Sequence, residues 1–125
     1  MGRNQTFDTT EVLRTITSLL TKTNPDSLGM DAMIKATNIQ RQSIYRTWGS
    51  KSGLIASAIQ YASKNASERD LVAILALSLG SESAFEKPVH DALNSLVNHL
   101  SKEKENQSLQ TLIGKYLINR IGRNK

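Results

Sequence analysis

The stretch "GMDAMIKATNIQRQSIYRTWGSKSGLI", residues 29–55, decides how the rest of the chain is interpreted. Its apolar residues predict a short helix over 29–37, of only about two turns. Asn38 follows at once, and asparagine tolerates the left-handed backbone conformation that often ends a helix. A second short helix is expected over 40–48. Two short helices joined by a turn of about three residues are the layout of a helix-turn-helix.

The second of these helices has a narrow apolar seam. Ile44 and Trp48 are spaced four residues apart, Tyr45 lies beside Ile44, and every other position is polar. Such a helix packs along one edge and exposes the rest of its surface, as an element lying in a DNA groove must do. Gly49 and Ser50 then break it, and a fourth helix is expected from residue 51.

Positive charge is concentrated around the same stretch. The chain has 125 residues and a formal net charge of +5, yet no acid lies between Asp31 and Glu68. The bases in this window are Lys35, Arg41, Arg46, Lys51 and Lys64. A localised basic patch is the expected footprint for a polyanion. A basic face that only meets water is the alternative reading of a cluster of this size.

Residues 29–54 resemble the DNA-binding domain of TetR/AcrR-family transcriptional regulators. The resemblance rests on the spacing Y-x-x-W-x-x-K-x-x-L after a small hydroxyl and an apolar residue, here Ser43, Ile44, Tyr45, Trp48, Lys51 and Leu54. It covers about residues 7–62, because the helix expected over 7–22, with Asp8, Thr9 or Thr10 as its cap, lies where the family's first helix lies. Three positions depart from the family pattern and bear on base preference: Asn38, Gln40 and Thr47. Gln40 stands where Ser or Thr usually caps the third helix, so a weaker cap is expected there.

Chemistry and resemblance together assign DNA contacts to one group of residues. Arg41 and Gln42 begin the helix that would enter the major groove, where Arg suits guanine and Gln suits adenine, although either can hold phosphate instead. Lys51 and the free amides at the start of the next helix would clamp a phosphate. Trp48 is expected in the core. The predicted DNA-binding residues are Gln40, Arg41, Gln42, Ser43, Tyr45, Arg46 and Lys51.

The second half of the chain is expected to be helical too. Apolar residues at helical spacing occur over 69–79, 89–102 and 107–122, with a charged loop from residue 101 to 107. The sequence therefore predicts an all-α protein of about seven helices, with a helix-turn-helix domain at 1–62 and a short dimerisation domain at 63–125.

The last two predicted helices form a hairpin with wide apolar stripes. A two-helix hairpin cannot bury both stripes alone, and pairing with a second copy would make a four-helix bundle. The sequence therefore predicts a homodimer. The predicted interface residues are Leu93, Leu96, Val97, Leu100, Leu112, Ile113, Tyr116 and Leu117.

Several classes of function find no support in the sequence. The chain has no Cys, and its two histidines, His90 and His99, lack metal-ligand spacing. Catalytic triads, P-loops and dinucleotide-binding glycine motifs are not found either, so neither an enzyme nor a cofactor or metal is expected. No apolar run reaches the ~20 residues of a membrane span and no signal peptide is recognised, which predicts a cytoplasmic protein.

The resemblance implies a homodimeric repressor that binds a palindromic operator in double-stranded DNA. The family's effector-binding half is much longer than the roughly 60 residues present here, so a reduced or missing small-molecule pocket is expected. Without such a pocket, control by a partner protein becomes more plausible. Two alternatives stay open: a DNA-coating protein of the plasmid-partition or nucleoid type, and a protein-interaction adaptor that has lost DNA binding.

Overall fold

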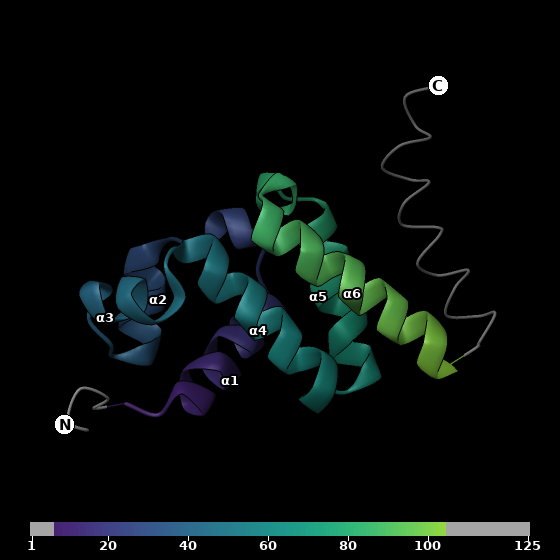
Figure 1. Cartoon of the computed structure of the whole chain (residues 1–125), viewed down its shortest axis with the longest axis horizontal. Helices are drawn as coiled ribbons and strands as arrows, with labels where there is room; N and C mark the ends of the chain where they lie inside the picture. Colours follow the sequence, from purple (N-terminus) through teal and green to yellow (C-terminus); the bar gives the residue numbers. More distant parts are fainter. Residues whose placement is uncertain (1–6, 105–125) are drawn as a thin grey trace.

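The computed structural model describes residues 7–104, and the regular secondary structure of this part is entirely helical, with no strand (Figure 1). The prediction of an all-α fold is confirmed. The α-helices are α1 (Thr9–Leu20), α2 (Met30–Thr37), α3 (Arg41–Trp48), α4 (Lys51–Asn65), α5 (Glu68–Leu79) and α6 (Lys87–Lys104). Two short 3-10 helices, η2 (Pro25–Ser27) and η3 (Glu82–Phe85), lie before α2 and α6.

The first helix begins and buries its stripe for reasons visible in its sequence. Of the three predicted caps, Asp8 is the one used, because its carboxylate accepts a hydrogen bond from the Thr10 backbone N–H at 2.9 Å. Val12, Ile16 and Leu20, each four residues from the next, are buried on one face.

Helix α4 lies at the centre of the core, with α1 and α3 packed against it on one side and α6 along another (Figure 1). Its apolar stripe is buried in full and consists of Leu54, Ile55, Ala58, Ile59 and Ala62. The hydroxyl of Thr17 in α1 donates a hydrogen bond to the carbonyl of Ala58 at 3.1 Å, a polar tie between two buried faces. One hydrophobic cluster includes residues of all six α-helices, so the domain boundary predicted near residue 62 stays a prediction.

The end of α6 differs from expectation. A charged loop was expected from residue 101, but the helix continues to Lys104. The reason is that Lys and Glu are good helix formers and no Gly or Pro interrupts this stretch. The last predicted helix, at 107–122, lies outside the described residues.

A carboxylate joins two short segments that lie far apart in the sequence. Asp26 in η2 accepts hydrogen bonds from the backbone N–H of Glu82 at 2.6 Å and of Ser83 at 3.0 Å, and from the Ser83 hydroxyl at 2.8 Å. These bonds fix the loop before α2 to the loop before α6. The donors, first the Glu82 N–H and then the Ser83 hydroxyl, lower the pKa of Asp26 below its ordinary value.

Candidate nucleic-acid interface

The turn between α2 and α3 has the backbone conformation that the sequence predicted. Asn38 adopts φ 60° and ψ 36°, and its N–H donates to the Ile34 carbonyl at 2.7 Å. No other described non-glycine residue has a positive φ. Ile39 follows as a plug that is only 6% exposed. The turn thereby fixes α3 relative to α2; the two helices and this turn are called the α2–α3 unit below.

Two side chains seat α3 on the rest of the protein. Ile44 is fully buried, and Trp48 is half-buried against the core, with its ring centroid 6.2 Å from that of Phe7. Gln40 occupies the capping position but makes no side-chain hydrogen bond there, so the cap is as weak as expected. The narrow apolar seam is confirmed, because the other side chains of α3 are exposed apart from a half-buried Ser43. The exposed ones are Arg41, Gln42, Tyr45, Arg46 and Thr47.

The junction of α3 and α4 depends on Ser50 and on Gly53, and the sequence did not predict the role of Gly53. The Ser50 hydroxyl caps α4 by accepting from the Gly53 N–H at 3.0 Å. A Cβ atom on Gly53 would lie 2.1 Å from the Trp48 carbonyl oxygen, so the two helices approach too closely for any other residue. The available signal was a glycine in the first turns of a helix, where glycine is otherwise unfavourable.

The predicted base-reading arginine is already paired. Arg41 Nη2 donates to Asp31 Oδ1 at 2.7 Å, which joins the first residue of α3 to the first turn of α2. The sequence placed Asp31 at the edge of the acid-free window and did not pair it with Arg41. The side chain of Arg41 is half exposed, so it is still reachable from solvent.

The predicted phosphate clamp at the start of α4 has acidic neighbours. Lys51 is half-buried, and its positive charge is a minor contributor to the lowered pKa of Asp26, behind the hydrogen bonds to Asp26. The Ser52 hydroxyl donates to the carboxylate of Glu86, which precedes α6. These carboxylates weaken the positive potential at this helix start and come from segments far away in sequence.

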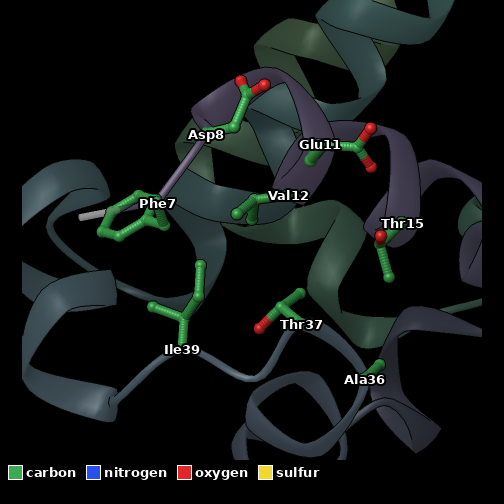
Figure 2. A pocket seen from close by; sticks show the side chains of 8 residues that line it. All are labelled: Phe7, Asp8, Glu11, Val12, Thr15, Ala36, Thr37 and Ile39. Atoms are coloured by element: carbon green, nitrogen blue, oxygen red, sulfur yellow. The ribbon is translucent and has the colours of Figure 1, made fainter. Parts of the chain in front are cut away.

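A small hollow of about 230 Å³ lies beside the α2–α3 unit, between the start of α1 and the turn after α2 (Figure 2). Figure 2 shows Val12 and Ile39 on its apolar side and Asp8 and Glu11 on its rim. With two carboxylates and no base among its lining residues, this hollow does not suit a phosphate.

The predicted dimer residues that the structure describes pack within their own chain. Leu93, Leu96 and Leu100 are at most 4% exposed and belong to the chain's own core, and their part in a dimer stays a prediction. Val97 is half-buried against that core. Leu112, Ile113, Tyr116 and Leu117 lie outside the described residues. Among large apolar side chains in the described part, Tyr45 and Phe85 are the exposed ones, at 45% and 86%.

In residues 7–104, no group of three or more His, Cys, Asp or Glu side chains gathers as metal ligands would. Within the same residues, none of the helices has both the length and the apolar character needed to cross a membrane.

In comparisons with protein-family models, with curated proteins and with solved structures, nothing matches the chain.

Proposed function

We propose that this chain is a sequence-specific DNA-binding regulator of transcription, with α2 and α3 as its helix-turn-helix and a TetR-like mode of action. The observation that carries the proposal is the division of α3. Ile44 and Trp48 attach the helix, while four of its exposed side chains, Arg41, Gln42, Tyr45 and Arg46, can donate hydrogen bonds outward. A short helix that is attached by one edge and polar elsewhere fits a major groove.

The roles divide between base edges and phosphates. Arg41 and Gln42 begin α3 and would meet base edges, as the first residues of a recognition helix do. Tyr45 and Arg46, one turn later, would donate to phosphates on the groove wall. Lys51 would add its charge to the amides at the start of α4, in spite of the carboxylates nearby.

A homodimer would present two copies of α3 to successive major grooves, about 34 Å apart, and would therefore select a palindromic site. Binding at a promoter would exclude polymerase, which makes repression the expected outcome. Three hollows in the described part of the chain are open to solvent and none of them is an enclosed cavity, which supports control by a partner protein over control by an enclosed small molecule.

Selection of bound sequences from a random DNA pool tests the proposal. The expected result is one enriched palindrome with a footprint confined to it. A footprint that spreads along the DNA as protein is added would favour a coating protein instead. Failure to enrich any sequence and to shift any duplex at low salt would reject DNA binding.

The salt dependence of binding provides a matched pair of variants. Lys51 and Lys64 lie at opposite ends of α4, roughly 20 Å apart along a helix that rises 1.5 Å per residue. Lys51→Ala is expected to flatten the slope of log K against log salt by about one, while Lys64→Ala leaves it unchanged. If both variants have the same slope of log K against log salt, Lys51 does not contact the DNA.

An adaptor that binds protein is the second candidate, because Arg41 is paired with Asp31 and Lys51 lies among carboxylates. These acids reduce the affinity of the surface for any polyanion. The two candidates separate in a variant that combines Arg41→Ala, Tyr45→Phe and Lys51→Ala. Biological activity that survives all three changes would favour the adaptor, and lost activity together with lost DNA binding would favour the regulator.

A further inference from the structure

We propose that Asp31 is a positioning residue that directs Arg41 to a guanine base instead of a phosphate. The proposal rests on the DNA-binding function above and names what that site would recognise. Its starting point is the hydrogen-bonded ion pair of 2.7 Å between Arg41 Nη2 and Asp31 Oδ1.

The ion pair between Arg41 and Asp31 contributes little to the stability of the fold. The side chain of Asp31 is 93% exposed and that of Arg41 is 50% exposed, and ion pairs with this exposure add little to the free energy of unfolding. The α2–α3 unit is already held by the buried Met33, Ile39 and Ile44. The contact is therefore better explained by what it does to the arginine.

The arrangement leaves Arg41 able to read a base. A guanidinium carries five N–H donors in a planar fork, and the carboxylate of Asp31 occupies one of them. A guanine presents O6 and N7 side by side in the major groove and needs two donors. Because Arg41 is the first residue of α3, it lies at the end of the helix that enters a groove first.

The charge of Asp31 decides between the possible ligands. A phosphate that approached Arg41 would also meet the carboxylate of Asp31 and be repelled by it, whereas a guanine edge carries no net charge. Water leaves the interface when DNA binds, and the lower dielectric then strengthens the ion pair. The pair also limits the rotamers of Arg41 in advance, which reduces the entropy lost on binding.

Arg46 provides the contrast within the same helix. It lies in the last turn of α3, is exposed, and forms no ion pair with a described residue. An unpaired arginine keeps its full charge for the phosphate backbone. The proposal therefore assigns guanine to Arg41 and phosphate to Arg46.

The test compares Asp31→Asn with Asp70→Asn in the full chain. Both residues are exposed aspartates in the first turn of a helix, so the charge and helix-dipole changes are matched, but Asp70 lies on α5. Each variant is taken through selection from a random DNA pool. Affinities for the best site and for its single-base replacements are then measured at two salt concentrations.

Asp31→Asn is expected to reduce the preference for guanine at one position of each half-site by about threefold, while affinity for unrelated duplexes rises. Asp70→Asn should keep the wild-type preference. Arg41→Lys retains the charge and loses the planar fork, so it should reduce the same guanine preference by about tenfold or more. Unchanged thermal unfolding of Asp31→Asn would confirm that the effect is not one of folding.

Two results would overturn the inference, and they are distinguishable from failure of the proposed function. If Asp31→Asn binds all sequences more tightly by the same factor, the carboxylate only repels DNA. If Arg41→Lys keeps the guanine preference, Arg41 is not the reader. A wild-type protein that binds no duplex would instead reject the regulator itself, and the inference with it.

Discussion

At the scale of single residues, the α2–α3 unit depends on backbone conformations that few side chains allow. Asn38 holds a left-handed conformation at the end of α2, and Gly49 has φ 86° at the end of α3. These two residues determine the directions in which the chain leaves each short helix. A residue that disfavours these conformations would shift α3 relative to α2 at position 38, or relative to α4 at position 49.

Asn38 offers a direct test of that dependence. Asn38→Gly is expected to change the free energy of unfolding by no more than about 0.5 kcal/mol, because glycine adopts the left-handed region freely. Asn38→Ala should cost about 1 kcal/mol more, since its Cβ crowds the carbonyl oxygen. Urea unfolding monitored by circular dichroism measures both, and equal stability of the two variants would contradict the prediction.

Local features of this kind are what the sequence predicted well. The left-handed Asn38, the weak cap at Gln40 and the seam of Ile44 and Trp48 all follow from a few adjacent residues. The contacts of Arg41 with Asp31 and of Asp26 with Ser83 were missed, because a linear pattern does not say which distant polar groups meet. The leucines of α6 show the same limit: their spacing predicts a buried face but not the surface that covers it.

At the scale of helices, α3 and α4 are joined by a close backbone approach at Gly53. Gly53 lies in the second half of the first turn of α4, directly against the Trp48 carbonyl at the end of α3. The position of α3 is therefore set by α4, and the indole of Trp48 is seated by the same junction.

Gly53→Ala is expected to cost about 1–3 kcal/mol of stability, because the new methyl group overlaps backbone that cannot move alone. Gly80→Ala is the matched control, since Gly80 is exposed with φ −85°, a conformation that alanine adopts. Urea unfolding measures both variants. If Gly53→Ala is as stable as Gly80→Ala, the close approach has little importance for the junction.

At the scale of the whole molecule, Asp26 is the polar link between the segment that precedes α2 and the segment that precedes α6. Its carboxylate accepts three hydrogen bonds from η3 residues, and these favour the ionised form. Loss of that charge would loosen the attachment of one half of the described chain to the other.

The pKa of Asp26 gives this link a defined pH dependence. Because the pKa is lower in the folded state than in the unfolded chain, ionisation stabilises the fold above the unfolded value and this contribution disappears as pH falls through the folded value. Asp26→Asn should therefore be less stable than wild type at pH 7, with a difference that narrows in acid. Ser83→Ala should show part of the same effect. If the difference in the free energy of unfolding between wild type and Asp26→Asn stays constant down to low pH, the prediction is contradicted.

Three replacements by aspartate test the folding of the chain and its assembly. Leu96 is fully buried, so Leu96→Asp is expected to unfold the chain at a cost of several kcal/mol, whereas Asn94→Asp, on the exposed face of α6, is tolerated.

Leu117→Asp tests the predicted dimer contacts of residues 107–122. It should retain helicity and halve the mass measured by light scattering; an unchanged mass would place the dimer contact elsewhere.

The central position of α4 bears on how this protein could be recombined with others. The buried stripe of α4 supports α1 and α3 on one side and α6 on the other, so a single helix belongs to both halves at once. A chimera that cuts the chain after α4 would deprive α6 of its main packing surface, and one that cuts before α4 would remove the support of α3. Exchange of recognition specificity with another protein should therefore graft only the outward residues of α3 and leave the helix boundaries intact.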